Sequence, residues 1–458
     1  MTDKNESLTN SPDRRQFLTQ AGALGLGASV LPSGVSLGAG DKKVRHACIG
    51  LGGMGNTDFM QMLEHPAVEI VAICDIDVSR SLKARKLVPH ATFYQDWREL
   101  LAKEDIDSIN VTVPDHMHAS ITMTALEKGR HVYCQKPLTH DIYEARKIGA
   151  KAVETGLVTQ MGTQVTSTVN ERQAVSMIQS GAIGKVKEAF MWSNKPPMKY
   201  RPTGPRPEGS DPVPESLNWE SWLGTAPMRP YKTGVYHSTW WRGWQDFGCG
   251  WLGDMGCHIM DMPFRSLELS MPESVKADVE PEWADHPERR VETFPRWQIV
   301  EYTYPGTRYT AGDSIKLTWL DGDKYPDDKL RKHIDDKPWP TQGSFLIGEK
   351  GAMLLPFRGV PELFLNDSSA KVEVPEMPEQ HHYHQFIDAI LGKEEGHTHS
   401  PFSYASKSTE MVLMGTIALR FPGQTLNWDA GKMSFPEVPA ANKFVRREYR
   451  EGWEIKGL

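Results

Sequence analysis

Short apolar runs alternate with helical patterns along the first part of the chain. Apolar runs of about four to eight residues predict buried strands, whereas apolar residues three or four positions apart predict helices. We therefore expect strands at Val44–Ile49, Val68–Asp77, Ile106–Val113 and His131–Cys134, and helices at Trp97–Leu101, Ala119–Lys128 and Asp141–Thr155. Such alternation is typical of a doubly wound parallel sheet, the Rossmann arrangement.

The pattern changes after Gly162. A helix is expected at Val169–Gln179, and a second helix at Ser403–Arg420 is expected to pack back toward the first domain. The predicted strands of this part are Val186–Trp192, Trp297–Tyr304, Ser314–Trp319 and Ser344–Ile347. The chain is therefore predicted to be an α/β protein, with an N-terminal Rossmann domain at 41–163. The C-terminal α+β domain at 164–458 should contain a large, mostly antiparallel open sheet.

An Arg pair, Arg14–Arg15, precedes Phe17, Leu18 and a modest apolar run at 21–31. The run is too short to span a bilayer as a helix. An Arg pair followed by a short Gly- and Ala-rich segment is typical of an export signal, and the order RRxFL resembles the twin-arginine signal. We expect residues 1–40 to direct the protein to the periplasm or another exported location. A disordered tail with a chance Arg pair is the alternative.

The amino-acid composition limits the kinds of partner that the protein is expected to bind. The 458 residues contain 52 Lys and Arg against 59 Asp and Glu, a net charge of -7, which argues against a nucleic-acid partner. The mean hydropathy of -0.48 indicates a soluble globular protein without stable membrane insertion. No two of the five cysteines form a C-x-x-C pair, so we expect small buried hydrophobic residues and neither disulfides nor a zinc site.

The first predicted strand runs directly into the loop GLGGMG, which contains Gly50, Gly52, Gly53, Met54 and Gly55. In a G-x-G-x-x-G loop the first Gly permits the turn, the second lets a pyrophosphate approach, and the third lets helix pack on strand. Asp75 ends the second strand about twenty residues further on, where a carboxylate accepts ribose hydroxyls. No Arg or Ser follows at once to take a 2′-phosphate, so we expect NAD rather than NADP.

Three other motifs carry candidate chemistry. VTVPDHMH, with Pro114 and His118, and CQKPL, with Gln135 and Lys136, follow predicted strands of the parallel sheet, where ligands gather. The stretch GDMGCHIMD places Asp254, His258 and Asp261 at intervals of four and three, which would stack them on one helical face.

Taken together, these four motifs resemble the family of glucose–fructose oxidoreductase, inositol dehydrogenase and rhizopine catabolism protein (Gfo/Idh/MocA). The resemblance implies that Lys136 lies beside the nicotinamide, and that Asp254 and His258 form a carboxylate–imidazole pair with Asp261 as a supportive acid. It also assigns Pro114 and His118 to the nicotinamide-side loop. Gln135 stands where the family usually has Glu, and Asp115 where it has Asn.

The chemistry of an alcohol dehydrogenase suits these residues. Oxidation of a secondary alcohol needs a hydride acceptor, which NAD supplies, and a group that removes the hydroxyl proton. An imidazole at His258, oriented by Asp254, can take that proton. Lys136 can stabilise the developing negative charge on the oxygen.

A Pro- and Trp-rich insert occupies residues 194–253. We expect Trp219, Trp222 and Trp251 to anchor it. Two readings remain for the other aromatic residues: they also anchor the loop, or they bind a sugar. The candidate substrate-binding residues are Tyr236, Trp240, Trp244, His237 and Arg242, together with Asp261. A histidine cluster at 381–384 lacks a recognisable metal spacing and is interpreted as the surface of a helix start, so no metal is expected.

The leading hypothesis is an exported NAD-dependent oxidoreductase that acts on a hydroxyl of a sugar, glycoside or polyol and holds its cofactor through the cycle. The resemblance also implies a homo-oligomer. One rival is a redox-neutral glycosidase or lyase that works by transient ring oxidation and elimination. The other is a non-catalytic protein that binds a sugar or a partner.

Overall fold

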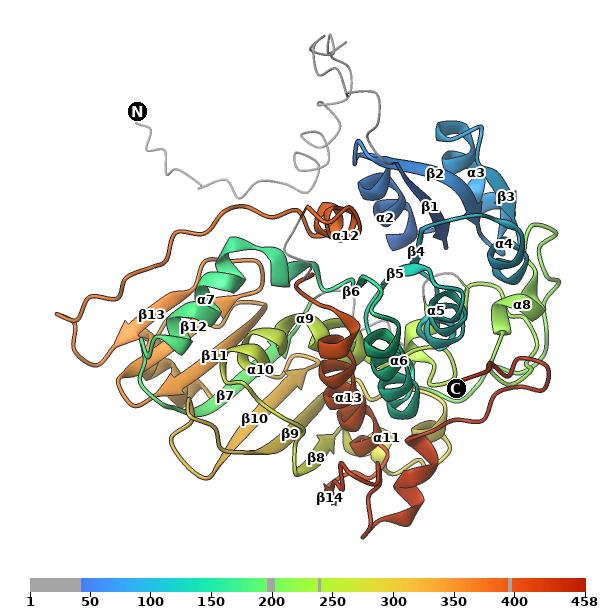
Figure 1. Ribbon diagram of the computed structural model, residues 1–458. Coiled ribbons are helices and arrows are strands. Elements are labelled where there is room, and N and C mark those ends of the chain that lie inside the picture. Colours follow the sequence, from blue (N-terminus) through green and yellow to red (C-terminus); the bar gives the residue numbers. More distant parts are fainter. Residues whose placement is uncertain (1–42, 196–201, 238–239, 394–397) are drawn as a thin grey trace, which may run out of the picture. The chain divides into compact units, whose positions relative to one another are not determined.

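The computed structural model describes residues 43–195, 202–237, 240–393 and 398–458 (Figure 1). One compact unit, Lys43–Leu458, contains all of them. The predicted export signal at 1–40 lies outside the described residues. Within the described ranges, no helix is both long and apolar enough to cross a membrane.

The first sheet has six strands in the order β3-β2-β1-β4-β5-β6, and every pair is parallel. Its strands are β1 (Val44–Ile49), β2 (Val68–Cys74), β3 (Thr92–Tyr94), β4 (Ser108–Val111), β5 (His131–Cys134) and β6 (Thr159–Met161). The helices between them are α2 (Met54–Leu63), α3 (Val78–Leu87), α4 (Trp97–Lys103), α5 (His118–Glu127) and α6 (Ile142–Thr155). The predicted Rossmann sheet is confirmed. Short β3 has few apolar residues, which is why the sequence pattern did not reveal it.

The second sheet has eight strands in the order β13-β12-β11-β7-β10-β9-β8-β14. Only β7 and β10 pair in parallel; the other neighbours are antiparallel. The strands are β7 (Val186–Ser193), β8 (Ser274–Val279), β9 (Gln298–Pro305), β10 (Ser314–Asp321), β11 (Gln342–Gly348), β12 (Gly351–Pro356), β13 (Glu362–Leu365) and β14 (Thr425–Asn427). The mostly antiparallel second sheet is therefore confirmed.

Helices cover one face of this sheet and join it to the first (Figure 1). They are α7 (Val169–Gln179), α9 (Cys257–Ile259), α10 (Asp261–Ser266) and α13 (Phe402–Ala418). Helix α13 packs along α6, as predicted, and Arg146 of α6 forms an ion pair of 2.6 Å with Glu410 of α13. The smaller helices are α8 (Trp219–Leu223), α11 (Pro281–Ala284) and α12 (His382–Ile390). The two domains thus share a packed helical layer.

The predicted helical face at 254–261 is interrupted. Leu252–Gly256 (η5) form a π-helical turn, and α9 and α10 follow with Met260 between them. A π-helix closes its hydrogen bonds five residues apart rather than four, so residues spaced four apart no longer stack directly. π-helical turns occur frequently at functional sites.

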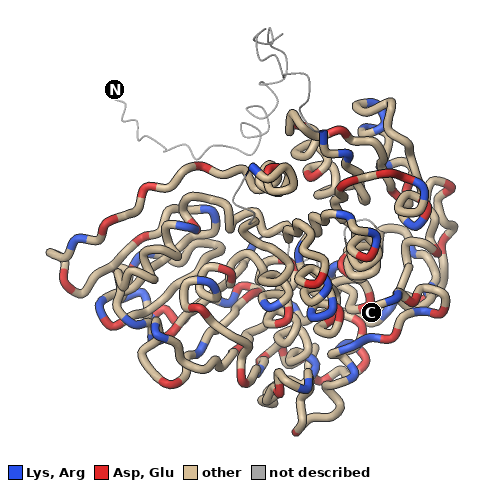
Figure 2. The backbone as a smooth tube through the Cα atoms, viewed as in Figure 1, with Lys and Arg blue, Asp and Glu red and all other residues tan. Residues whose placement is uncertain are grey.

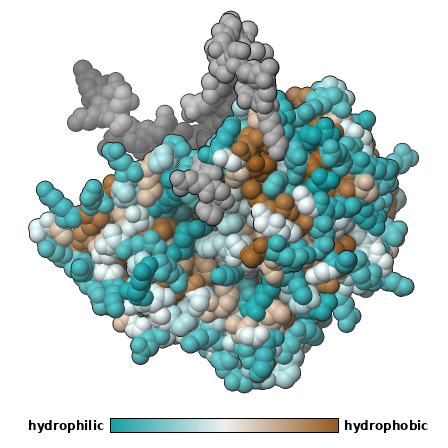
Figure 3. All heavy atoms as spheres, in the orientation of Figure 1, coloured by the Kyte–Doolittle hydropathy of each residue, from teal (hydrophilic) through white to brown (hydrophobic). Residues whose placement is uncertain are grey.

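The surface mixes both signs of charge. Figure 2 shows Lys and Arg interspersed with Asp and Glu along the chain. Figure 3 shows hydrophilic side chains over most of the displayed face, with scattered apolar ones. The five cysteines are buried, which confirms their interpretation as small buried hydrophobic residues.

Candidate functional site

The glycine loop between β1 and α2 has the close contacts that a phosphate-binding turn requires. Gly50 has φ +89°, and a Cβ there would lie 2.1 Å from the carbonyl oxygen of Thr112. A Cβ on Gly55 would lie 2.2 Å from the carbonyl oxygen of Gly50. Helix α2 starts at Met54, and no side chain caps its N-terminal N–H groups. Those groups and the helix dipole favour an anionic ligand such as a pyrophosphate.

Asp75 follows β2 at the edge of the same loop. Its carboxylate accepts hydrogen bonds from the backbone N–H of Leu51 at 2.8 Å and of Asp77 at 2.9 Å. Burial raises the pKa of Asp75. Each oxygen keeps a lone pair for ribose hydroxyls. The guanidinium of Arg80 lies against Gly52, since a Cβ on that Gly would be 2.4 Å from Nη1. Sequence spacing did not single out Arg80.

Lys136 and Asp254 form the centre of the other end of the site. Lys136 follows β5, and its Nζ donates to Oδ1 of Asp254 at 2.5 Å and to the main-chain oxygen of Asp254 at 2.8 Å. The Nε of Arg242 lies 3.2 Å from the same Oδ1. Although burial opposes ionisation, Arg242 and Lys136 hold the pKa of Asp254 well below its usual range. Asp254 is therefore a fixed anion between two cations.

His258 lies one turn beyond Asp254 and faces the same cavity. Its Nδ1 is buried without a hydrogen-bond partner among the described residues, and its ring centroid is 5.8 Å from that of Phe357. Burial, followed by Lys136, lowers the pKa of His258 well below 6.5. The imidazole is neutral at pH 7 and can accept a proton. The sequence predicted that Asp254 orients His258. In the structure the π-helical turn instead directs the carboxylate of Asp254 to Lys136 and Arg242.

His118 is held by two carbonyl groups. Its Nδ1 is 2.7 Å from the oxygen of Pro137 and its Nε2 is 2.9 Å from the oxygen of Val113. Because carbonyls only accept, both nitrogens must donate, as they do in an imidazolium ion. Burial opposes this charge, but Cys134, Asp115 and the Pro137 carbonyl raise the pKa of His118 to about 9. His118 thus fixes the loops on either side of Lys136.

The two residues that depart from the family motifs have specific partners. The Nε2 of Gln135 donates to both carboxylate oxygens of Asp58, at 2.9 and 3.1 Å. Asp58 also accepts from the hydroxyls of Thr112 and Tyr383. Buried Asp115 accepts from the backbone N–H of Cys249 at 3.0 Å. The amide of Gln135 is therefore complementary to a carboxylate that sequence reasoning did not identify.

The Trp-rich insert forms a small core of its own and is bonded to the first domain. Trp219 and Trp222 stack with centroids 4.8 Å apart, which confirms their predicted anchoring role. The backbone N–H of Asn218 donates to the oxygen of Ile76, and that of Val78 to the oxygen of Ser216. His237 adds a side-chain contact, with its Nε2 2.9 Å from Oδ2 of Asp77. The insert thus borders the turn after β2.

The candidate substrate residues separate into two groups. His237 and Arg242 line the cavity, as does Trp241, which was not a candidate. Tyr236 and Trp244 are buried in the core of the insert, and Trp244 donates to the oxygen of Val235. Trp240 and Asp261 are also absent from the described cavity wall. Asp261 is buried, and it accepts from Tyr404 and contacts Arg265.

The histidine cluster forms the start of α12, as interpreted. His381 is the N-cap residue, and its Nδ1 accepts from the backbone N–H of His384. Candidate ligand atoms of Glu64, His381 and His384 lie within 4.8 Å of one another. The N-cap bond occupies Nδ1 of His381 and confirms that the cluster stands at a helix start.

One continuous cavity of about 670 Å³ connects the two ends of the site. Its wall includes the nucleotide-side residues Gly50, Gly52, Gly53, Met54, Asp75, Pro114, His118 and Gln135. It also includes Lys136, Asp254 and His258. Further wall residues that the motifs did not indicate are Gln164, Lys195, Gln342, Phe357 and Arg358. The site therefore has a groove the size of a dinucleotide, and its far end contains the cation Lys136 and the imidazole of His258.

Family profiles match most of the chain. The profile of the Gfo/Idh/MocA oxidoreductase family, NAD-binding Rossmann fold, matches residues 44–163. The profile of the same family's C-terminal alpha/beta domain matches residues 169–455. The chain belongs to the Gfo/Idh/MocA family. Its first domain is thus an NAD-binding Rossmann domain.

Individual members of the Gfo/Idh/MocA family have low sequence identity to this chain. The chain is 25% identical over 167 residues to levoglucosan dehydrogenase of Pseudarthrobacter phenanthrenivorans, covering 36% of this chain and 34% of that protein. It is 29% identical over 156 residues to a glycosyl hydrolase family 109 protein of a Shewanella species, covering 31% and 33%. The chain therefore matches about a third of the length of these curated relatives.

A solved structure extends the similarity of fold to nearly the whole length. The WlbA dehydrogenase of Bordetella pertussis, solved with NADH and UDP-GlcNAcA, superimposes with a TM-score of 0.60 at 15% identity. The match covers 85% of this chain and 99% of that chain.

Proposed function

We propose that this protein is an exported NAD-dependent oxidoreductase that oxidises a hydroxyl of a sugar, glycoside or polyol and retains its cofactor through the cycle. The observation that carries the proposal is the single cavity, which has the glycine loop at one end and Lys136, Asp254 and His258 at the other. A carbohydrate substrate is supported by the names of the relatives, levoglucosan dehydrogenase among them.

The residues of the groove fit NAD. Side chains at Gly50 and Gly55 would fill the space of the turn, the start of α2 offers uncapped N–H groups, and Asp75 has acceptors for ribose. Bound NAD would supply the hydride acceptor. Met54, Pro114, His118 and Gln135 would line its binding site.

Side chains of the protein take up the proton and stabilise the charge that develops during oxidation. Neutral His258 accepts the proton of the reacting hydroxyl as the general base. Lys136, held by Asp254, donates a hydrogen bond to the same oxygen and stabilises its developing charge. Asp254, which Arg242 also contacts, keeps the ammonium group of Lys136 in place. His237 and Arg242 are the proposed contacts to the remaining substrate hydroxyls or a carboxylate.

Export by the twin-arginine route is part of the proposal and rests on Arg14, Arg15, Phe17 and Leu18. That route moves folded proteins, so cofactor can be loaded before export. A homo-oligomer is also proposed from the family resemblance. A fusion of residues 1–40 to a reporter, compared with an Arg14→Lys/Arg15→Lys variant, tests export: loss of export only in the variant supports the signal.

A second candidate function is a redox-neutral glycosidase or lyase, favoured by the similarity to a glycosyl hydrolase family 109 protein. In this reaction transient oxidation of a ring hydroxyl would acidify the adjacent C–H, and loss of that proton would expel the glycosidic substituent. A glycosidase would then add water to the unsaturated ring, a lyase would not, and the hydride would return to the ring. His237 is the candidate acid for the leaving group because it lines the cavity.

The first test is whether nicotinamide cofactor stays with the purified protein through dialysis. The protein is denatured, and the supernatant is assayed for NAD and NADH. Near-stoichiometric NAD is expected, followed by its reduction on addition of a sugar from a panel. Cleavage of a glycoside without net reduction would select the second candidate. Reversible binding of added NAD by a protein purified empty would contradict the retained cofactor.

A further inference from the structure

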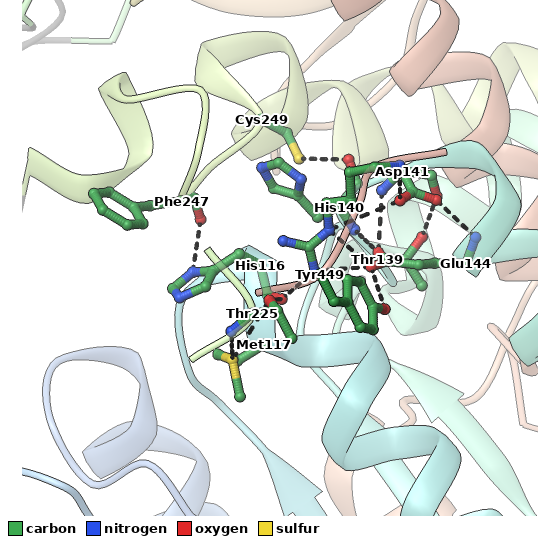
Figure 4. Close-up of polar contacts among 11 residues, drawn as sticks. His116, Met117, Thr139, His140, Asp141, Glu144, Thr225, Phe247, Cys249 and Tyr449 are labelled. Atoms are coloured by element: carbon green, nitrogen blue, oxygen red, sulfur yellow. Dashed lines mark hydrogen bonds and ion pairs between the residues drawn. The ribbon is translucent and has the colours of Figure 1, made fainter. Parts of the chain in front are cut away.

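A second cavity, of about 300 Å³, is separate from the NAD cavity and has no lining residue in common with it among the described residues. His140 and Asp141 of its wall follow the Lys136 motif, and Gly248 and Cys249 precede the Asp254 turn. Figure 4 shows part of this wall, with the Cys249 thiol directed at the carbonyl oxygen of His140. The opposite wall comes from the end of α13 and the C-terminal segment.

Arg420, just after α13, contributes a positive charge to the wall of this cavity. Its Nε donates to Oε1 of Gln245 at 2.9 Å, and its guanidinium lies 4.1 Å from the ring centroid of Phe444. Within the described ranges, no carboxylate lies at ion-pair distance from Arg420. Burial lowers its pKa to about 10, so Arg420 remains charged at neutral pH. Arg420 is half-buried, and no carboxylate touches it although Asp246 raises its pKa from a distance, so an anion in the cavity would stabilise its charge.

A second cation approaches the same place. The Nζ of Lys443, at the exposed side of the cavity, lies 4.8 Å from the ring centroid of Phe444. Arg420 and Lys443 thus share one aromatic ring. Neither has a carboxylate at ion-pair distance among the described residues, so both cations would attract an anion that enters the cavity.

The acidic groups of the wall are already engaged. Arg447 contacts Glu144 at 2.8 Å and Asp141 at 3.8 Å, and Asp246 forms a short ion pair with Arg229. Burial and the neighbouring Glu144 raise the pKa of Asp141. Glu448, at the exposed rim, is the remaining acid of the wall. Arg420 is therefore the half-buried cation of the wall that no carboxylate touches among the described residues.

His140 supplies a further polar atom. Its Nε2 is buried without a hydrogen-bond partner among the described residues. Burial, Arg447, His116 and Arg420 lower the pKa of His140 well below 6.5, so the ring is neutral. His140 lines the cavity, and a neutral imidazole that carries its proton on Nε2 can donate one hydrogen bond.

We propose that this cavity binds a small oxyanion, either a phosphate or a carboxylate group, with Arg420 as its principal partner. The planar guanidinium offers two parallel N–H donors that match either group. Lys443 contributes charge at the entrance, and His140 contributes a neutral donor. Among the described residues, the site shares no lining residue with the NAD cavity.

The test measures binding of inorganic phosphate and of acetate by calorimetry, at constant ionic strength in chloride and with NAD saturating. NAD occupies the anion-binding turn of the first site. We expect saturable binding of at least one of the two anions, weakened about tenfold or more in Arg420→Gln and less in Lys443→Gln. Arg308→Gln is the matched control, because Arg308 is exposed and pairs with Glu268 away from this wall. Its binding should equal that of the wild type.

The anion whose binding saturates at the lower concentration shows whether the natural ligand carries a phosphate or a carboxylate group. Binding that does not saturate, or that is unchanged in Arg420→Gln, would overturn the proposal. If Arg420→Gln does not fold, Arg420→Lys replaces it. That variant keeps the charge and loses the paired donors, so unchanged affinity in both Arg420→Lys and Lys443→Gln would also overturn the proposal.

Discussion

The Nζ of Lys136 lies 2.5 Å from Oδ1 of Asp254, although the two residues are 118 positions apart in the chain. Lys136 comes from the end of a strand in the parallel sheet, and Asp254 from the π-helical turn of the second domain. Both side chains are only 11% exposed. The contact therefore requires both domains, and its geometry leads to the first prediction.

Lys136→Met should lower kcat by about a hundredfold to a thousandfold, because it removes a donor to the reacting oxygen. NAD should remain bound, since the glycine loop is untouched. The measurement is reduction of NAD by the best sugar of the panel. Lys151→Met is the control, because Lys151 pairs with Glu127 and Glu154 on the surface. Activity within twofold of the wild type would remove Lys136 from the proposed role.

His258→Ala should lower the rate of cofactor reduction by substrate about a hundredfold to ten-thousandfold and leave NAD bound. Because burial and Lys136 lower the pKa of His258, the wild-type rate should not fall as pH drops through 6.5. His286→Ala, at an exposed site beside Glu288, should behave as the wild type. A rate that titrates near 6.5 would contradict a buried neutral base.

Gln135→Glu should destabilise the fold by about 2 kcal/mol at pH 7, because it replaces the donor to Asp58 with a second carboxylate. Burial already raises the pKa of Asp58 to about 6. The variant's folded state should hold more protons than its unfolded state, so its stability should improve as pH falls toward 5. Urea unfolding at several pH values measures this.

The double variant Asp58→Asn/Gln135→Glu provides the control. It exchanges the amide and the carboxylate and should recover most of the lost stability at pH 7. A double variant that is no more stable than Gln135→Glu would show that the contact with Asp58 is not the cause.

His118 should make stability fall between pH 6.5 and 9. Its folded pKa of about 9 exceeds its ordinary value of 6.5, so its contribution is complete below pH 6.5 and is lost as pH rises through 9. The expected change is up to about 3 kcal/mol. Comparison of the wild type with His118→Gln isolates this contribution from those of other groups. Parallel stability curves for the two proteins would contradict a charged His118.

Asp75→Ala should weaken the binding of NAD by about tenfold to a hundredfold without changing the reaction rate at saturating NAD. Asp75 has acceptors for ribose and also fixes the N–H groups of Leu51 and Asp77. Fluorescence titration with NAD measures the effect. Asp96→Ala is the control, because Asp96 caps α4 and contacts Arg98 at the surface.

The parallel sheet and its glycine loop were predictable because their signals are local: a short apolar strand, closely spaced glycines and an amphipathic helix. The family resemblance placed Lys136 and Asp254 in one site, but neither the resemblance nor the spacing predicted the contact between them. The π-helical turn could not be predicted, since its sequence reads equally well as α-helix. Asp58 gave no signal because its partners, Gln135 and Tyr383, are distant in sequence. Tyr236 and Arg242 have similar local context, and only tertiary packing separates the core of the insert from the cavity wall.

The hydrogen bonds between the insert and the turn after β2 bear on how fast a nucleotide can leave. The wall of the NAD cavity contains Trp222 and His237 from the insert and Ile76 and Arg80 from the first domain. A dinucleotide in that cavity would be enclosed by both segments. The Asn218–Ile76 and Val78–Ser216 hydrogen bonds and the packing of Trp222 hold these two segments together. Where local opening of such a loop limits dissociation, a ligand of moderate affinity stays bound for a long time.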